Sequence, residues 1–369
     1  MRSLLPAVLA VVCLPPVPLS AQAAATSART GVYFETYSFG SGLAFNKISE
    51  FTIPFVVTQR LGNRLTLDVS SAYASASVTE AGGSQVEYSG LVDTDVRATI
   101  GVIPGKLVFN VIGTLPTGAQ AVADTTIPLF GATATDLFGF TTPSFGSGGG
   151  VSAGFASAFR MGTSWAFGTG ASYRQGMTYT PVAGGSEMAP GGEIRARLGV
   201  EGPVGGAKYF RSAFVYTRTG NNDLGGGSQS AIGDRFLLYA ALSMPLGNAH
   251  LSVYGWNMLR QRPSDFATPG TVSVPRGNVF TLGAKLDRPL SPRTILAPLL
   301  EFRHELTATA TQMELLGYLL RAGTDLRYRL NDRATTVLQA QVAAGKLHDQ
   351  GTTVSVAGPR LGLWIEWTR

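Results

Sequence analysis

A hairpin of two alternating arms spans residues 89–118 and limits most strongly what this chain can fold into. Successive side chains of a β-strand point to opposite faces, so strict alternation predicts one apolar face and one charged face. The apolar face of the first arm is Val92, Thr94, Val96, Ala98, Ile100 and Val102. Pro104-Gly105 then predicts a tight turn, and a second arm follows from Leu107. Arms of about ten residues are long enough for tilted strands to cross a bilayer.

The same unit recurs along the chain, with short and long connections in alternation. The predicted short turns are 61–64, 103–106, 161–164, 202–205, 245–248, 290–293 and 330–333. The longer polar or Gly-rich segments are 79–89, 117–147, 180–190, 220–230, 261–276, 307–314 and 347–356. Tight turns on one side and longer loops on the other are typical of membrane barrels. The pattern predicts an all-β, transmembrane antiparallel up-and-down β-barrel.

The number of strands has two solutions in the range of 14–16. Seven short turns, a first strand near 31–39 and a last strand near 360–367 give 16 strands. If the first segment lies inside the lumen instead, 14 remain. A soluble barrel, with its apolar face inward, is a third solution that the alternation alone leaves open.

Charged residues on the faces opposite the apolar ones are predicted to face the barrel lumen. They are Asp93, Asp95, Arg97, Glu193, Arg195, Arg197, Glu301, Arg303, Arg321, Asp325 and Arg327. One interpretation is a salt-bridged lumen, because inward charges need partners or water. The other is a polar path or an electrostatic filter.

The N-terminus is typical of a secretory signal peptide. Arg2 precedes an apolar stretch, and Ala21-Gln22-Ala23 matches a cleavage site, so we expect a signal peptide in 1–23 and a barrel in 24–369. The only cysteine, Cys13, lies in the signal segment, which leaves no thiolate metal site in the mature chain. No later apolar run is long enough for a membrane helix. The predicted location is the bacterial outer membrane.

The last predicted strand resembles the C-terminal assembly signal of bacterial outer-membrane barrels. The matching residues are Arg360, Gly362, Ile365 and Trp367, and the departure is Thr368-Arg369 after the aromatic residue. The expected partners are therefore outer-membrane lipid and the barrel-assembly machinery. Trp165, Trp256, Trp364 and Trp367 lie near predicted strand ends, where interfacial aromatic girdles form.

Enzymatic, metal and nucleic-acid chemistry find little support in the sequence. The net charge of +6 is spread along strands without a basic run, so no nucleic-acid partner is expected. His250, His304 and His348 have no metal-ligand spacing, and no cofactor motif occurs. A Ser–His pair of a membrane-embedded lipid-modifying enzyme has no local pattern behind it. We expect no enzyme, no metal and no cofactor.

The segment 117–147 is the longest connection, yet it is rich in apolar residues. An external loop should be polar, and an apolar one indicates either a small core at the barrel mouth or a surface that binds apolar molecules. The candidate ligand-binding residues are Leu129, Phe130, Leu137, Phe138 and Phe140.

The segments Ser89-Gly90-Leu91-Val92-Asp93 and Leu115-Pro116-Thr117-Gly118, joined by the alternating hairpin, resemble outer-membrane proteins of the FadL superfamily. The resemblance is closest to the branch named for the meta-pathway of phenol degradation, and it covers about 50–118. It implies a 14-stranded barrel whose relatives help hydrophobic compounds to cross the outer membrane. The Asn-Pro-Ala plug signature is absent, and Leu91-Val92 stands where the branch has Gly before Asp, so no substrate carries over.

Together these patterns predict passive uptake or capture of small hydrophobic molecules by an outer-membrane barrel. A general diffusion porin or a structural barrel without a specific ligand is the alternative, and an integral lipid-modifying enzyme is the third hypothesis.

Overall fold

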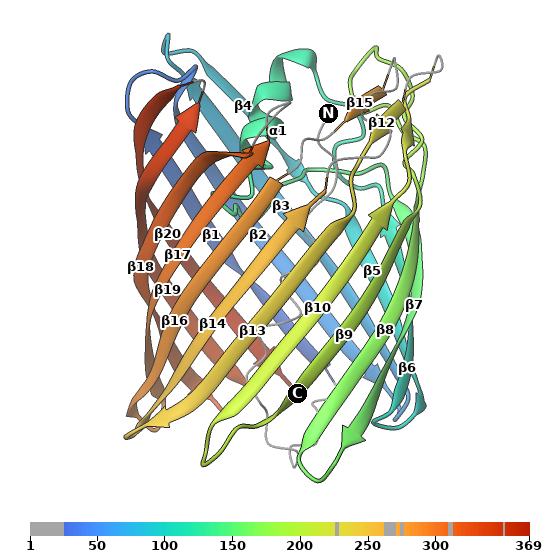
Figure 1. The fold of residues 1–369 in the computed structure, drawn as a ribbon, viewed down its shortest axis with the longest axis vertical. Helices are drawn as coiled ribbons and strands as arrows, with labels where there is room; N and C mark the ends of the chain where they lie inside the picture. The colour runs from blue at the N-terminus through green and yellow to red at the C-terminus, as the bar shows by residue number, and fades with distance from the viewer. Residues whose placement is uncertain (1–25, 226–228, 262–270, 274–276, 309–312, 350) are drawn as a thin grey trace.

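The computed structural model describes residues 26–225, 229–261, 271–273, 277–308, 313–349 and 351–369. They form a closed antiparallel β-barrel of tilted strands (Figure 1). The barrel has 16 strands when β4 and β5, which both pair with β3, are counted as one. The predicted signal peptide, 1–23, lies outside the described residues.

Neighbouring barrel strands are consecutive in the chain, as an up-and-down barrel requires. Their bounds are β1 Thr26–Phe39, β2 Phe45–Leu61, β3 Leu65–Glu80, β4 Gln85–Leu91, β5 Thr94–Ile103, β6 Leu107–Leu115, β7 Gly150–Met161, β8 Trp165–Gly176, β9 Glu193–Pro203, β10 Tyr209–Thr219, β13 Arg235–Leu246, β14 Ala249–Arg260, β16 Gly277–Ser291, β17 Thr294–Ala308, β18 Met313–Asn331, β19 Ala334–Asp349 and β20 Thr352–Thr368.

The first strand closes the barrel. Tyr33 of β1 lies opposite Thr52 of β2 on one side and opposite Gly362 of β20 on the other. The 14-strand solution, which placed this segment inside the lumen, is therefore wrong. Both edges of β1 are hydrogen-bonded, so no sheet edge is left open between the ends of the chain.

Apolar side chains cover the outside of the barrel. Val96 and Ile100 on β5 are 38% and 45% exposed, and Leu198 on β9 is 47% exposed. The alternating charged residues, such as Arg97 and Arg197, point to the inside. An apolar exterior around a polar interior is the arrangement of a transmembrane barrel, and the soluble alternative with an apolar interior is wrong.

Alternation fails at one predicted position. Between Ser70 and Tyr73 of β3 lie two residues, but three lie between their partners Asp95 and Leu91. The extra residue forms a bulge, and Val92 consequently turns inward to pack against the buried apolar cluster described below. Val92 therefore does not belong to the lipid-facing row that the sequence predicted.

The two ends of the barrel differ. All seven predicted short turns join strands at one end (Figure 1). The other end carries the 3-10 turn η2 (Asp124–Thr126), helix α1 (Ile127–Thr133) and a small sheet of β11 (Asn222–Asp223), β12 (Gln229–Ala231) and β15 (Thr271–Ser273).

The prediction of a long connection at 347–356 is wrong, because β19 and β20 extend through it. Val354 and Val356 face inward there and join the apolar cluster. Within the described residues, no helix is long and apolar enough to cross a membrane.

Candidate functional site

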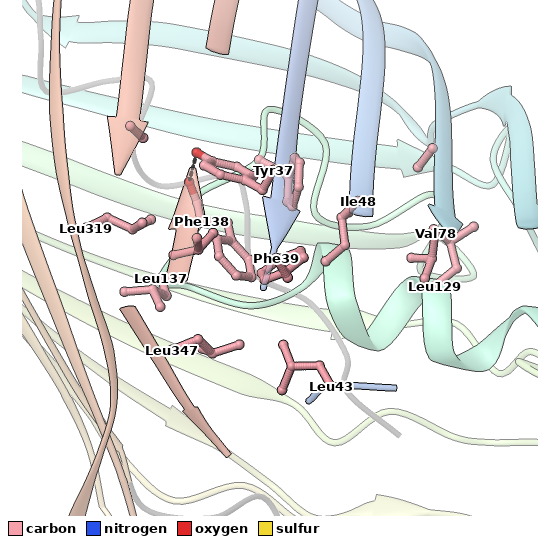
Figure 2. Close-up of a cluster of buried hydrophobic side chains, with 14 of the residues drawn as sticks. Tyr37, Phe39, Leu43, Ile48, Val78, Leu129, Leu137, Phe138, Leu319 and Leu347 are labelled. Atoms are coloured by element: carbon pink, nitrogen blue, oxygen red, sulfur yellow. Dashed lines mark hydrogen bonds between the residues drawn. The ribbon is translucent and has the colours of Figure 1, made fainter. Parts of the chain in front are cut away.

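The connection between β6 and β7, residues 116–149, lies inside the upper part of the barrel, and we call it the inner loop. Its apolar side chains pack against β1, β2, β3, β18, β19 and β20 in a buried cluster (Figure 2). The members of this cluster are Tyr37, Phe39, Leu43, Ile48, Ala74, Ala76, Val78, Leu129, Leu137, Phe138, Phe140, Phe145, Leu319, Ala343, Leu347, Val354 and Val356.

Aromatic rings form the centre of this cluster. The Tyr37 ring lies 4.9 Å from the Phe138 ring and 5.5 Å from the Phe140 ring, measured between centroids. Leu129, Leu137, Phe138 and Phe140 are at most 5% exposed, and Phe130 is partly buried. The inner loop therefore forms the small core that the sequence left as one of two alternatives. That these five residues also contact a ligand stays a prediction.

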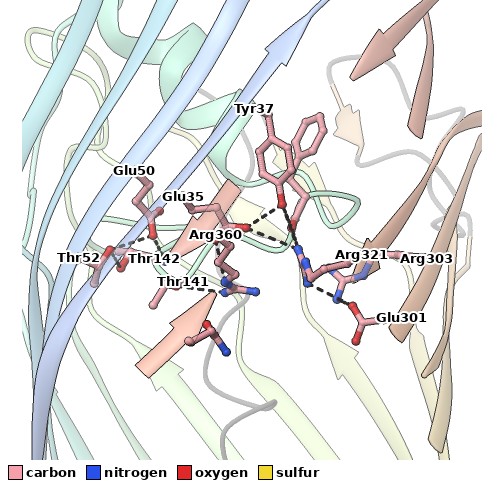
Figure 3. Close-up of polar contacts among 12 residues, drawn as sticks. Glu35, Tyr37, Glu50, Thr52, Thr141, Thr142, Glu301, Arg303, Arg321 and Arg360 are labelled. Carbon is pink, nitrogen blue, oxygen red and sulfur yellow. Dashed lines mark hydrogen bonds and ion pairs between the residues drawn. The ribbon is translucent and has the colours of Figure 1, made fainter. Parts of the chain in front are cut away.

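A buried arginine connects the barrel wall to the inner loop (Figure 3). The Arg321 side chain on β18 donates hydrogen bonds to the Phe138 carbonyl (3.0 Å), to Tyr37 Oη (3.0 Å) and to Glu301 Oε1 (3.2 Å). Its Nη2 also lies 3.5 Å from Glu35 Oε1. A buried charge without partners is costly. Arg321 therefore favours the loop position in which the Phe138 carbonyl remains one of its acceptors.

Two glutamates of the first strands hold the next part of the inner loop, Glu35 through Arg360 and Glu50 directly. Glu35 is 2% exposed and pairs with Arg360, which in turn donates to the Thr141 hydroxyl (3.3 Å). Glu50 Oε1 accepts hydrogen bonds from the Thr142 backbone N–H and from the Thr52 hydroxyl, both at 2.9 Å.

A second anchor lies on the other side of the loop. Arg303 donates to the Asp136 carbonyl (3.1 Å) and pairs with Glu301 (3.3 Å), while the Asp136 carboxylate pairs with Arg260 (3.4 Å). Tyr254 donates to the second oxygen of Glu301 (3.0 Å). We call the lumen-facing surface of β1–β3 and β17–β20, against which most of the inner loop packs, the closed wall.

Asp93 ties the two ends of the inner loop together. One carboxylate oxygen accepts from the Gly118 N–H (3.0 Å), and the other accepts from the N–H (2.6 Å) and hydroxyl (2.7 Å) of Ser147. A Cβ atom at Gly118 would lie 2.1 Å from the Phe145 carbonyl oxygen, so only glycine fits there. The two segments that carry the sequence resemblance thus contact one another, and Asp93 is a structural residue at their junction.

The glycine run before β7 permits close packing. Gly148 has φ of +74°, and the ring of Tyr179 from the β8–β9 loop lies against it, 2.3 Å from where a Cβ atom would be. Burial, and next the nearby Asp93 carboxylate, raise the pKa of Tyr179 to about 12. The phenol is therefore neutral at any physiological pH.

The lumen surface opposite the closed wall has a different character. On β7 and β9, the lumen-facing Ala156, Ala158 and Arg197 are exposed. Glu193 on β9 binds Arg195 (2.6 Å) and Arg235 (2.8 Å). We call the lumen-facing surface of β5–β9 the open wall.

The predicted lumen charges lie in different parts of the barrel. Glu301, Arg303 and Arg321 meet on the closed wall, and Asp93 binds both ends of the inner loop. The charges on the open wall are Asp95, Arg97, Glu193, Arg195 and Arg197. Asp325 pairs with Lys285 (2.6 Å) and accepts from Gln339 (3.0 Å). Within the described part of the chain, Arg327 has no ion-pair partner.

Sequence reasoning missed Glu35, Tyr37 and Glu50 as anchors of the inner loop, and it considered Arg360 only as part of an assembly signal. The signal was present, because Glu35 alternates with Phe34, which is 38% exposed on the outer face. Alternation identifies an inward carboxylate, but it does not show which loop the carboxylate meets.

The C-terminal motif divides between the two faces of β20. Gly362 faces inward, and a Cβ atom on it would lie 3.0 Å from the Tyr33 ring. The Tyr33 ring also stacks on the Trp364 ring, with 5.3 Å between the ring centroids. Ile365 is 38% exposed on the outside. Trp364 and Trp256 thus belong to the lumen rather than to an aromatic girdle. The Arg303 guanidinium lies over the Trp256 ring, with its Cζ atom 5.4 Å from the ring centroid.

The histidines show no catalytic arrangement in the described residues. His348 Nδ1 lies 2.8 Å from the Thr353 hydroxyl at the exposed end of the barrel, and His304 stacks on Phe302 on the outer face. No group of three potential metal ligands occurs among the described residues. That the chain is no enzyme stays a prediction.

The comparisons with known proteins find likeness only at the level of structure. No protein-family model matches the chain, and no curated protein does. Among solved structures, a bacterial polysaccharide outer membrane secretin is similar over 93% of this chain and 98% of its own, at 10% identity and a TM-score of 0.48. OccK11 (OpdR) of Pseudomonas aeruginosa is similar over 93% and 96%, at 14% identity and a TM-score of 0.47. A loop-deletion mutant of OmpT of Vibrio cholerae is similar over 94% and 99%, at 12% identity and a TM-score of 0.44.

Proposed function

We propose that this chain is a bacterial outer-membrane channel that conducts small solutes passively past the inner loop. One observation carries the proposal. Hydrogen bonds from Arg321 to the Phe138 carbonyl and from the Thr142 N–H to Glu50 hold the inner loop on the closed wall, while Ala156 and Arg197 on the open wall keep solvent-exposed side chains inside the barrel. A loop fixed to one side narrows a pore without filling it. The apolar exterior and the alternating turns support the location in a membrane.

The sequence resemblance is compatible with this proposal at the hairpin only. Thr117 donates to the Val92 carbonyl (2.9 Å), and Asp93 accepts from Gly118, so the two resembling segments form one structural unit. The 16 strands differ from the 14 that the resemblance implies.

The test is single-channel conductance of the purified barrel in planar bilayers. We expect small, steady conductance steps, because the remaining path lies along one wall. Replacing residues 124–142 by a short Gly-Ser linker should raise the conductance several-fold. A silent wild-type barrel would refute the proposal.

A matched control keeps the inner loop in place. The Thr52 and Thr142 hydroxyl oxygens are 3.2 Å apart, so Thr52→Cys combined with Thr142→Cys offers a disulfide between the wall and the loop. The oxidised double variant should conduct as the wild type does. Loss of conductance on oxidation would mean that solutes pass only when the loop moves, which contradicts a path along the open wall.

Uptake of hydrophobic solutes is a second candidate function, and one observation favours it. Phe130 is only partly buried, and its ring lies 5.3 Å from that of Tyr88 and 5.4 Å from that of Phe145 at the edge of the cluster. An apolar solute would find an aromatic surface there. Phe130→Ser should slow uptake of an apolar solute and leave uptake of a small sugar unchanged. Phe155→Ser, on the outer face, is the control, and equal loss of both solutes would refute this candidate.

A further inference from the structure

Guanidinium groups form a row across the lumen side of three strands. The strand register places Thr217 of β10 opposite both Arg195 and Arg235, and it places Arg235 opposite Arg260. Arg197 lies one lumen-facing position further along β9 than Arg195. The row therefore continues from the anchors of the inner loop, where Arg260 binds Asp136, onto the open wall.

Most of this row is neutralised. Glu193 pairs with Arg195 and Arg235, and Asp136 pairs with Arg260. These groups have the partners that buried charges need, and their side chains are at most about one-quarter exposed.

Arg97 and Arg197 are different. In the part of the chain that the structure describes, neither forms an ion pair or a hydrogen bond, and Arg197 is exposed. Arg97, Arg195 and Glu193 all lie close enough to act electrostatically on the Arg197 guanidinium, and Glu193 is already paired with Arg195 and Arg235. Each of these two guanidinium groups, without an ion-pair partner, adds a local positive potential to the water beside it.

Two carboxylates near Arg97, one on β3 and one on β5 itself, accept hydrogen bonds from hydroxyl groups. Asp68, opposite Arg97 in the register, accepts from the Thr58 hydroxyl at 2.6 Å. Asp95, on the same face of β5, accepts from the Thr114 hydroxyl at 2.6 Å. Neither forms an ion pair with Arg97, so the Arg97 guanidinium keeps its donors for a mobile partner.

We propose that Arg97 and Arg197 form an anion-attracting step on the solute path and that the solutes it favours are small carboxylates. The planar guanidinium fork matches the two oxygens of a carboxylate. Because Arg197 is exposed, the attraction is weak enough for release, as permeation requires. This inference rests on the proposed channel function and adds its substrate class.

The first experiment measures the reversal potential of the purified full barrel in a planar bilayer under a KCl gradient. We expect the wild type to prefer chloride over potassium. Arg97→Gln combined with Arg197→Gln should lower the chloride-to-potassium permeability ratio at least about fivefold, because a single unit charge at about 4 Å in water already changes the local concentration of one ion by about that factor. Arg293→Gln, in the turn between β16 and β17, is the control and should leave the ratio unchanged. The heat-dependent gel mobility of each variant verifies that the barrel has folded.

The second experiment compares gluconate with glucose, which have similar size and differ in charge. Proteoliposomes that contain the wild type should take up gluconate faster than glucose. The double variant should slow gluconate several-fold and leave glucose unchanged. A barrel that conducts without anion preference, or a double variant with an unaltered ratio, overturns this inference and leaves the channel function standing. A silent barrel overturns both.

Discussion

The closed wall and the open wall have the same outer surface and opposite inner ones. Val342 on β19 and Val96 on β5 are both exposed apolar residues of the outer face. Inside, Glu35 and Arg321 are at most 6% exposed and bind one another, whereas Arg197 is exposed and unpaired within the described residues. The comparison shows that alternation determines which face is polar, and that contact with the inner loop determines whether a polar group is an anchor or stays in water.

The largest expected effect comes from removing the central anchor. Arg321→Met leaves Glu35 and Glu301 buried with one partner fewer each, which should cost about 3–5 kcal/mol in the free energy of unfolding. Urea unfolding in phospholipid vesicles measures the cost, and a larger conductance should report release of the inner loop. Arg197→Met, on the open wall, should cost no more than about 0.5 kcal/mol. Equal costs on the two walls would remove the distinction between them.

The next effect tests whether the walls differ only inside. Val96→Arg and Val342→Arg each place a charge on the outer face. Each should reduce stability by about 2–4 kcal/mol near the bilayer midplane and by about 0–1 kcal/mol near an interface. Urea unfolding in vesicles of two thicknesses locates each residue in the bilayer. Either variant with wild-type stability in both vesicle types would contradict the assignment of that face to lipid.

Much of this fold was predictable from the sequence, because a barrel strand is a local pattern. The alternation at 193–201 gave the inward Glu193, Arg195 and Arg197, and the short turns gave 16 strands. Val92 was not predictable in the same way, since a bulge shifts the alternation by one residue and depends on the pairing with β3.

The candidate site was less predictable than the fold. The apolar composition of 117–147 indicated either a core or a binding surface, and the choice depends on what the loop meets. Its anchors come from Tyr37, Glu50 and Arg321, which are distant in the sequence. No periodicity reports such long-range contacts.

A third prediction compares the space on the two walls. Ala74 is fully buried on β3 beneath the inner loop, whereas Ala156 on β7 is exposed in the lumen. Ala74→Phe should cost about 1–3 kcal/mol through overpacking, with a conductance that rises if the loop is displaced. Ala156→Phe should leave stability nearly unchanged and lower the conductance, because the added ring occupies the solute path. Unaltered conductance of the Ala156 variant would place the path elsewhere.

The smallest expected effect lies at the border between the walls, where Asp93, between β4 and β5, holds both ends of the inner loop. Asp93→Asn keeps one acceptor oxygen and replaces the other by a donor, which cannot accept from the Ser147 N–H and hydroxyl. Because hydrogen bonds to charged groups are worth about 1.5–3 kcal/mol and part of the set survives, we expect a loss of about 1–2 kcal/mol. Hydrogen exchange should accelerate at Gly118 and Ser147, while Thr142, bound to Glu50, stays protected. If protection at Thr142 is lost as well, the closed wall does not hold the inner loop independently of its ends, and the loop opens as one unit.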